Sequence, residues 1–144
     1  MPTRKAEARW EGGLKEGRGE MKLGSGAFSG AYSFGTRFEG APGTNPEELI
    51  GAAHAGCFSM AFSAGLAKAG FPPRSVETKA KVHLEKVGEG FGITKIELDT
   101  EGDVPGISEG EFQRVAEEAK RGCPVSRALA SVPIELKAKL ASAA

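Results

Sequence analysis

The two cysteines of this chain, Cys57 and Cys123, are its best candidates for nucleophilic or redox chemistry. They lie 66 positions apart, so the chain lacks the CxxC spacing of a thioredoxin-type motif, and any bond between them would be a tertiary contact. Two interpretations are open: a structural disulfide, or two thiols that cycle through a disulfide. The second fits better, because an intracellular protein rarely keeps a structural disulfide.

The local surroundings predict different acidities for the two thiols. Cys57 lies in an apolar run, where a buried core thiol is the simplest interpretation. Burial raises a thiol pKa, so a reactive Cys57 needs a nearby cation. Cys123 follows Gly122 and precedes Pro124, at the predicted start of a helix, where free N–H groups favour the thiolate. From this alone, Cys123 is expected to be the more acidic thiol.

His54 precedes Cys57 by three residues, so both side chains are expected on similar faces of one helix. A Cys–His nucleophile pair and a pair of metal ligands are conceivable. The simpler alternative is a histidine that makes one polar contact or faces solvent, and His83 is expected at the surface of a strand. With two histidines and two cysteines in all, we expect no metal site.

Arg37 and the acids Glu47 and Glu48 form a second group of interest. Arg37 is either a plain edge arginine at the end of a strand or a cation that lowers a thiol pKa. Either acid could hold it through a bidentate pair. Glu47 precedes Cys57 by ten residues, or about 15 Å along a helix axis. If both serve one site, another residue must bridge them, or Glu47 must come from a symmetry-related subunit.

A long helix over residues 45–69 is the clearest predicted element. Asn45 suits the N-cap, Pro46 suits the first helical position, and Gly70 suits the C-terminal stop. Residues 49–67 carry no charge, but they are mostly Ala, Gly and Ser without an aromatic belt, so we expect a buried core helix rather than a membrane span. Small residues such as Gly51 and Gly56 would let a second subunit approach closely.

Alternation of polar and apolar residues, together with turn residues, predicts the remaining elements. Strands are expected over 3–10, 18–23, 28–38, 75–87, 91–99 and 134–140, and helices over 109–121 and 124–130. The predicted fold class is therefore α+β, with mostly antiparallel sheets around the long central helix. Residues 1–144 are expected to form a single domain. A helix that is apolar on nearly all sides favours a homodimer that buries it.

The composition restricts the classes of partner. Lys plus Arg and Asp plus Glu are 19 each, so the net charge is zero, and no nucleic-acid partner is expected. The first eleven residues are charged and contain no apolar leader, so we expect a soluble cytoplasmic protein without a membrane partner. Asn45 and Gln113 are the sole side-chain amides, a scarcity typical of thermophile proteins.

Two long blocks of sequence resemble the OsmC family (osmotically inducible protein C), which is related to the organic hydroperoxide resistance proteins. They are residues 45–61, NPEELIGAAHAGCFSMA, and residues 102–129, GDVPGISEGEFQRVAEEAKRGCPVSRAL. Each block contains one of the two cysteines, Arg37 stands at the expected place before the first block, and the HAGC sequence of residues 54–57 is similar to the OsmC branch.

This resemblance implies a cysteine-based peroxidase that prefers organic hydroperoxides and forms an intertwined OsmC-like homodimer with sites at the interface. By the resemblance, Cys57 is the peroxidatic thiol and Cys123 the resolving thiol. Arg37 would activate the thiolate and Glu47 would pair with Arg37. No metal, haem or other cofactor is implied, and an external dithiol, lipoyl-type or small, would act as reductant.

Further expectations concern the substrate and the competing functions. Phe58, Met60 and Phe62 are expected to form an apolar pocket suited to an alkyl peroxide. A cysteine hydrolase that uses Cys57 with His54 is one alternative function. A non-catalytic, stress-associated dimer that binds a ligand at the apolar helix is another.

Overall fold

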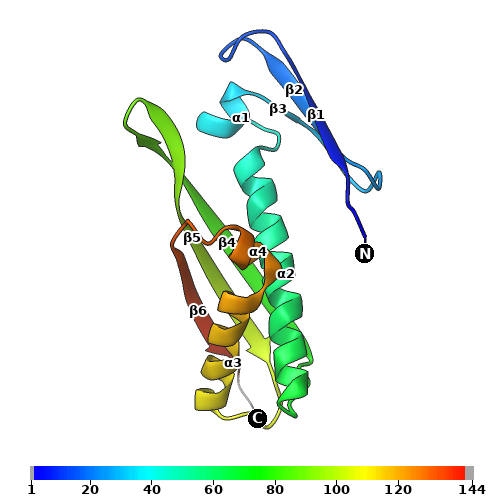
Figure 1. Cartoon of the computed structure of the whole chain (residues 1–144), viewed down its shortest axis with the longest axis vertical. Helices are drawn as coiled ribbons and strands as arrows, with labels where there is room; N and C mark the ends of the chain where they lie inside the picture. The colour runs from blue at the N-terminus through cyan, green and yellow to red at the C-terminus, as the bar shows by residue number, and fades with distance from the viewer. Residues whose placement is uncertain (1, 142–144) are drawn as a thin grey trace. The chain divides into compact units, whose positions relative to one another are not determined.

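The computed structural model describes residues 2–141, which divide into two compact units, one through Leu49 and one from Ile50 (Figure 1). The first unit holds β1 (Ala6–Glu11), β2 (Arg18–Leu23), β3 (Ser29–Tyr32) and α1 (Phe34–Phe38). Helix α2 (Pro46–Lys68) begins in the first unit and continues through the second. The second unit also holds β4 (Ser75–Val87), β5 (Gly90–Asp103), α3 (Glu109–Gly122), α4 (Pro124–Ala128) and β6 (Ile134–Leu140).

The first unit is an antiparallel meander of β1, β2 and β3 followed by the short helix α1. The Trp10 and Tyr32 rings pack across the sheet with centroids 5.3 Å apart. No apolar side chain of residues 2–49 is buried, and Leu14 and Phe28 are exposed. Within the described residues, this unit therefore lacks a hydrophobic core of its own.

The predicted strand over 28–38 is wrong in its second half. The strand ends at Tyr32, and residues 34–38 form α1. Ser33 and Thr36 form a reciprocal capping box: the Ser33 side chain accepts from the Thr36 N–H, and the Thr36 side chain accepts from the Ser33 N–H. These two hydrogen bonds satisfy the first N–H groups of a helical turn, which stabilises the turn against an extended strand. Arg37 consequently lies on a helix.

The predicted ends of α2 are confirmed. The Glu48 N–H donates to the Asn45 side-chain oxygen at 2.7 Å, which makes Asn45 the N-cap. At the other end Gly70 adopts a φ of 97°, and the Phe71 N–H donates to the Leu66 carbonyl at 2.9 Å. This left-handed residue closes the helix as glycine does in a Schellman-type stop.

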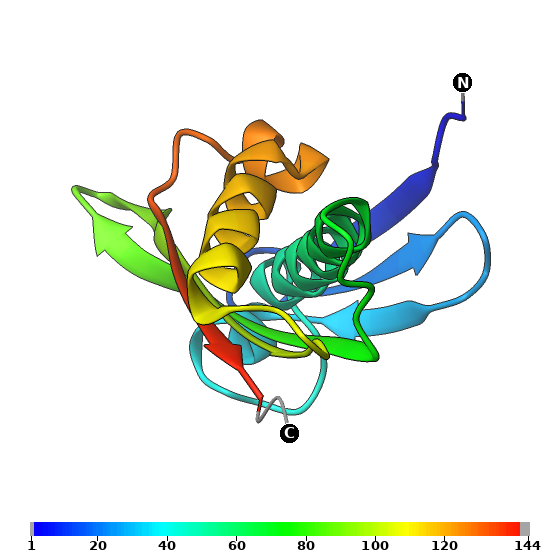
Figure 2. The ribbon, with the colours of Figure 1, turned by 90° about the horizontal axis from the view of Figure 1, so that it is seen from below.

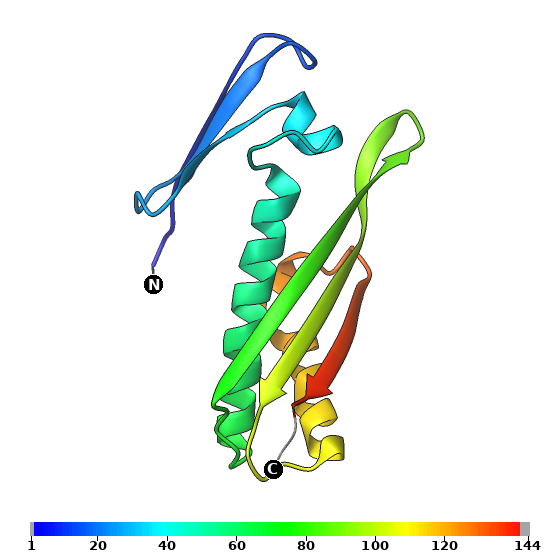
Figure 3. The same cartoon turned by 180° about the vertical axis from the view of Figure 1, so that it is seen from behind.

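The sheet of the second unit has the order β4-β5-β6. Strands β4 and β5 form an antiparallel hairpin, whereas β6 returns parallel to β5 after α3 and α4. Pairing with β6 reaches Gly102, opposite Leu140, so β5 extends beyond the predicted end at residue 99. Figures 2 and 3 show the second-unit part of α2 and the whole of α3 on the same face of this sheet. The predicted α+β class is confirmed.

An aromatic cluster forms the centre of the core beneath these two helices. Phe58 and Phe62 of α2 and Phe112 of α3 are fully buried, with ring centroids 5.5 and 5.1 Å apart along the series. Pairs of this kind add about 0.5–1.5 kcal/mol to the free energy gained from burial. The same core contains Cys123 and packs against Cys57, so it fixes the backbone that carries both thiols.

Helix α2 is long and apolar enough to cross a membrane, with a mean hydropathy of 1.4 over 18 residues. Core helices of soluble proteins pass the same test. Gly51 lies against the sheet, where an added Cβ would come 3.4 Å from Val82, whereas Gly56 faces open space. Gly51 and Gly56 were both expected to let a second subunit approach, but the space beside Gly51 is filled by the chain's own sheet.

Candidate active site

Arg37 and Glu47 form a bidentate ion pair in the first unit. The Arg37 Nε donates to one carboxylate oxygen of Glu47 at 3.0 Å, and its Nη2 donates to the other at 2.8 Å. Glu47 is 7% exposed, whereas the Arg37 side chain is 37% exposed, so the carboxylate is buried and the guanidinium faces solvent. The hydrogen bonds to Glu47 raise the pKa of Arg37 above its usual value. The pair therefore presents a fixed cation in one orientation.

The elements around this pair explain its geometry. Glu47 stands in the first turn of α2, directly after the Asn45 N-cap. The Asn45 side-chain amide donates to the Thr36 carbonyl at 3.1 Å and so ties α1 to the start of α2. Glu48, the other acid of this turn, accepts from the Thr44 hydroxyl at 2.8 Å. Glu47 rather than Glu48 is thus the partner of Arg37.

Cys57 and Cys123 come together in the second unit. Both are free; Cys57 is partly buried and Cys123 is fully buried. The two thiols lie within hydrogen-bonding reach of each other, and the backbone of Val125 lies within reach of Cys57. The fold therefore brings together two thiols that lie 66 residues apart in the sequence, close enough for each to shift the pKa of the other.

The two thiols differ in acidity. Burial raises the pKa of Cys57, and its contact with Cys123 raises it further, although the hydrogen bond from the Val125 backbone acts in the opposite direction. Burial also raises the pKa of Cys123, but its hydrogen bonds with the Ser126 side chain and backbone, with smaller contributions from Cys57 and Val125, outweigh it and lower the pKa overall. Cys123 is the more acidic thiol within this unit, as its local sequence predicts.

Cys123 caps two helices at once. Its N–H donates to the Ala119 carbonyl at the end of α3, and its sulfur accepts from the Ser126 N–H at 3.3 Å at the start of α4. The sulfur thus occupies the position that a serine or aspartate oxygen usually takes at an N-cap. These two hydrogen bonds fix the position of the Cys123 thiol, and the Cys123 backbone is extended between the two helices.

His54 is fully buried and contacts Ser126, with 2.7 Å between Nε2 and the Ser126 Oγ. The Cys123 thiol donates to the same Ser126 Oγ at 3.3 Å. His54 Nδ1 is buried and has no hydrogen-bond partner among the described residues. Burial lowers the pKa of His54, which favours the neutral imidazole. Hydrogen bonds therefore connect Cys123, Ser126 and His54 in a continuous series.

Ser126 is the residue of this region that the sequence analysis missed. The available signal was the spacing of Cys123, Pro124 and Ser126, because a residue three positions after an N-cap donates its N–H to the cap side chain. The contact of Ser126 with His54 had no local signal, since the two lie 72 residues apart.

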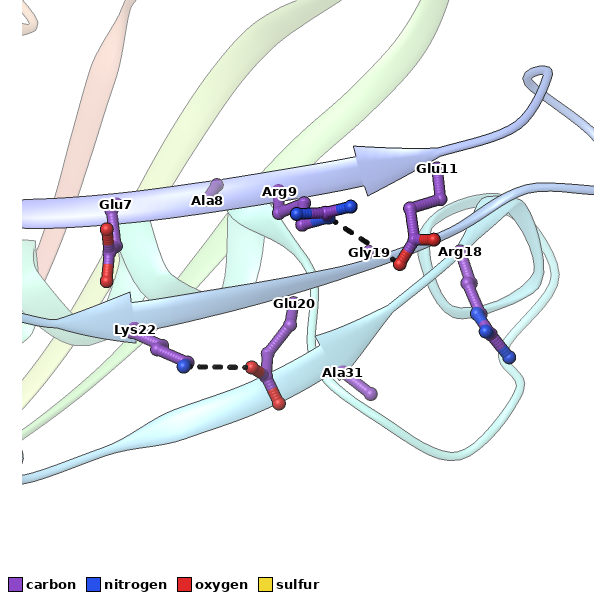
Figure 4. Close-up of a pocket in the computed structure, with 9 residues that line it drawn as sticks. All are labelled: Glu7, Ala8, Arg9, Glu11, Arg18, Gly19, Glu20, Lys22 and Ala31. Atoms are coloured by element: carbon purple, nitrogen blue, oxygen red, sulfur yellow. Dashed lines mark ion pairs between the residues drawn. The ribbon is translucent and has the colours of Figure 1, made fainter.

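Two other expectations concern an apolar pocket and a metal site. Phe58 and Phe62 are core residues and Met60 is 77% exposed, so the predicted apolar pocket is wrong for this chain. A cavity of about 460 Å³ lies instead on the first-unit sheet, where Figure 4 shows ion pairs between charged side chains and no thiol. Among residues 2–141, no group of three His, Cys, Asp or Glu side chains is arranged to hold a metal.

Comparison with known proteins identifies the chain. Residues 38–137 match the family model of OsmC-like protein. Over 127 residues the chain is 54% identical to "Peroxiredoxin OsmC" of Escherichia coli (strain K12), which covers 88% of this chain and 89% of that relative. The chain belongs to the OsmC family. The matched range of this OsmC-family chain includes Glu47 and both cysteines, and Arg37 immediately precedes it.

Two further relatives extend the comparison. The "Organic hydroperoxide resistance protein" of Xanthomonas axonopodis pv. citri (strain 306) is 37% identical over 90 residues, which is 62% of this chain and 61% of that relative. The crystal structure of an organic hydroperoxide resistance protein from Elizabethkingia anophelis superposes with a TM-score of 0.76 at 28% identity, covering 99% of this chain and 97% of that one. The fold of the OsmC-family chain is thus that of the hydroperoxide resistance proteins as well.

Proposed function

We propose that this OsmC-family chain is a thiol-dependent peroxidase that reduces organic hydroperoxides to alcohols in defence against oxidative stress. The proximity of Cys57 and Cys123 carries the proposal, because two neighbouring free thiols can form and release a disulfide. The names of the relatives, a peroxiredoxin and an organic hydroperoxide resistance protein, support the same activity.

In the first step, the Cys57 thiolate attacks one oxygen of the hydroperoxide and the O–O bond breaks. The alkoxide takes up a proton and leaves as the alcohol, while Cys57 becomes a sulfenic acid. Cys57 fits this role better than Cys123 because it is partly exposed, whereas Cys123 is fully buried. Accessibility therefore assigns the peroxidatic role to the less acidic thiol.

In the second step, Cys123 attacks the Cys57 sulfur, a disulfide forms, and the sulfenic oxygen leaves as water. Cys123 is suited to this step because its hydrogen bonds with Ser126 lower its pKa. A low thiol pKa also makes Cys123 a good leaving group when an external dithiol reduces the disulfide. The cycle needs no metal or prosthetic cofactor, since both sulfur atoms belong to the chain.

Arg37, held by Glu47, would supply the cation that Cys57 requires. Burial raises the pKa of Cys57, so its thiolate needs a positive charge nearby to form at neutral pH. The bidentate pair fixes the Arg37 guanidinium in one orientation, suited to stabilising both the thiolate and the negative charge that develops on the peroxide oxygen.

We also propose that the chain acts as a soluble, cytoplasmic homodimer in which each chain serves as one OsmC-like domain. Only 28% of the apolar window of α2 is buried within the chain, and no apolar side chain of residues 2–49 is buried. A second copy of the chain would cover these apolar surfaces, because a two-fold dimer brings the same surface of both subunits together. Full activity of a monomer in solution would contradict this part of the proposal.

A thiol titration tests the proposed activity. The reduced protein is mixed with one equivalent of cumene hydroperoxide, and free thiols are counted after denaturation, with hydrogen peroxide in a parallel sample. We expect two thiols per chain to be lost, faster with cumene hydroperoxide, and to return after treatment with a dithiol. Two unreactive thiols would overturn the peroxidase assignment and favour the ligand-binding dimer.

The hydrolase alternative has less support from the geometry. A Cys–His nucleophile pair needs the imidazole on the Cys57 sulfur, but the His54 Nε2 contacts Ser126. His54 Nδ1 has no hydrogen-bond partner among the described residues. The Cys57 sulfur instead contacts Cys123 and the Val125 backbone.

A further inference from the structure

The cycle described so far gives the buried residue His54 no part, and it gives Ser126 only its hydrogen bonds with Cys123. They lie directly behind the resolving thiol: the Cys123 thiol donates to the Ser126 Oγ at 3.3 Å, and that oxygen lies 2.7 Å from the His54 Nε2. The geometry allows one direction of donation throughout, in which the thiol donates to the hydroxyl and the hydroxyl donates to the imidazole. Such a series is a path for a proton.

Burial makes this path necessary. Cys123 is fully buried and Ser126 is 4% exposed, so bulk water does not reach the thiol to remove its proton. Cys123 must nevertheless lose that proton to become a nucleophile, because the thiolate is the attacking species. Among the described residues, the hydrogen bonds of the thiol lead to Ser126 and from there to His54, apart from its contacts with Cys57 and Val125.

The lack of a hydrogen-bond partner at His54 Nδ1 among the described residues also supports this path for the proton. A buried polar atom without a partner is destabilising, so a purely structural role would favour an apolar side chain here. Because no second hydrogen bond at Nδ1 fixes the tautomer, the Nε2 atom is able to accept a proton from Ser126.

We propose that Ser126 and His54 form a proton relay that takes the thiol proton of Cys123 as Cys123 attacks the oxidised sulfur of Cys57. The proton moves from the Cys123 sulfur to the Ser126 oxygen, whose own proton passes to His54 Nε2. The new S–S bond forms as the S–O bond of the sulfenic acid breaks, and the departing hydroxide becomes water with the proton that the imidazolium releases. Ser126 touches the reacting sulfur, and His54 acts through Ser126 as a positioning residue.

The groups that face the relay are few. Cys57 on α2 is the titratable group in contact with Cys123, and the strands packed against this region contribute apolar side chains to the shared core. Lys120, Arg121 and Arg127 line the surface groove beside Ser126. Burial lowers the pKa of His54, so the neutral imidazole is ready to accept the proton across the neutral pH range.

The test measures the attack of Cys123 separately from peroxide chemistry. Dithiobis(nitrobenzoate) first labels Cys57 as a mixed disulfide; Cys123 then displaces the second nitrothiobenzoate, and absorbance reports that step. Wild type is compared with Ser126→Ala and His54→Gln between pH 5.5 and 8.5. A parallel stopped-flow series with cumene hydroperoxide follows oxidation of Cys57 and then formation of the disulfide.

We expect both substitutions to slow the second step roughly 10²-fold at pH 7, the usual contribution of a positioned base, and to leave Cys57 oxidation within about twofold. The wild-type rate should be flat between pH 6.5 and 8, whereas the variant rates should rise about tenfold per pH unit with the thiolate fraction. His54→Gln keeps a hydrogen-bonding group near Nε2 but takes up no proton, so it separates the relay from simple structural support.

Two controls keep the test decisive. Ser126→Thr retains the hydroxyl and should restore the second step. Ser59→Ala, on the same helix as His54, removes a hydroxyl that donates to Thr78 of β4 and should change nothing. Wild-type rates and an unchanged pH profile in Ser126→Ala and His54→Gln would overturn the relay. The relay rests on the proposed function, but a protein that fails with peroxide and still shows the expected second step with the mixed disulfide would refute the peroxidase and retain the relay.

Discussion

Arg37 and Glu47 are joined by two hydrogen bonds, whereas the adjacent Glu48 contacts Thr44. This difference between neighbouring acids gives a matched pair of substitutions. Both glutamates lie in the first turn of α2, so both changes remove the same charge from the same helix end.

Glu47→Gln should reduce kcat/KM for cumene hydroperoxide by up to about 10²-fold, because the guanidinium loses its fixed orientation. Glu48→Gln should stay within about twofold of wild type. Steady-state assays with a dithiol reductant measure both. Equal losses in the two variants would show that helix charge matters rather than the contact with Arg37.

The two cysteines should give different chemical phenotypes. Cys57→Ser should abolish peroxide reduction, since it removes the attacking sulfur. Cys123→Ser should still consume one equivalent of peroxide and stop as a Cys57 sulfenic acid, which dimedone labels and mass spectrometry detects. Multiple turnovers of Cys123→Ser at the wild-type rate with the same dithiol would contradict the resolving role.

The buried His54 predicts a specific dependence of stability on pH. Burial lowers the pKa of His54 below its usual value of 6.5, so below that pH the unfolded chain binds a proton that the folded chain does not. The free energy of unfolding should therefore be fully retained above about pH 6.5 and fall as the pH drops, by up to about 1.4 kcal/mol per unit. In His54→Gln this component should vanish. Urea unfolding at pH 5, 6 and 7 measures the free energy of unfolding of wild type and His54→Gln. The same dependence on pH in both proteins would contradict the prediction.

Phe62 and Met60 of α2 differ sharply in exposure, at 0% and 77%. Phe62→Ala removes a ring that packs on Phe58 and Phe112, and should lower the free energy of unfolding by about 3–5 kcal/mol. Met60→Ala should change it by less than about 0.5 kcal/mol in a monomer. A larger loss with Met60→Ala that depends on protein concentration would indicate that a second subunit covers Met60.

Much of the fold follows from local sequence signals. Asn45 and Gly70 define the ends of α2, and the predicted alternation matches the observed burial along β4 from Ser75 to Val82, before the irregularity between His83 and Leu84. The helix α1 was missed because its stabilisation comes from the reciprocal Ser33–Thr36 box within a segment whose composition resembles a strand. The length of β5 depends on pairing with β6, a contact between distant segments that the β5 sequence does not specify.

The candidate site was predictable in its residue types but not in all its contacts. Local reasoning left Glu47 and Glu48 equivalent, and the direction in which each side chain leaves the helix decides between them. The sequence also allowed His54 a single polar contact, but it did not indicate the partner. The chain reversal between α3 and α4 brings Ser126 to His54 instead, across 72 residues.

The N-cap role of Cys123 ties the oxidation state of the protein to the order of α4. The sulfur that would enter the disulfide is also the acceptor for the Ser126 N–H in the first turn of this five-residue helix. A disulfide sulfur is a poorer acceptor than a thiolate, so oxidation should loosen the first turn of α4 and reduction should tighten it again. Hydrogen exchange at the Ser126 amide would then report the redox state of the protein from within its own backbone.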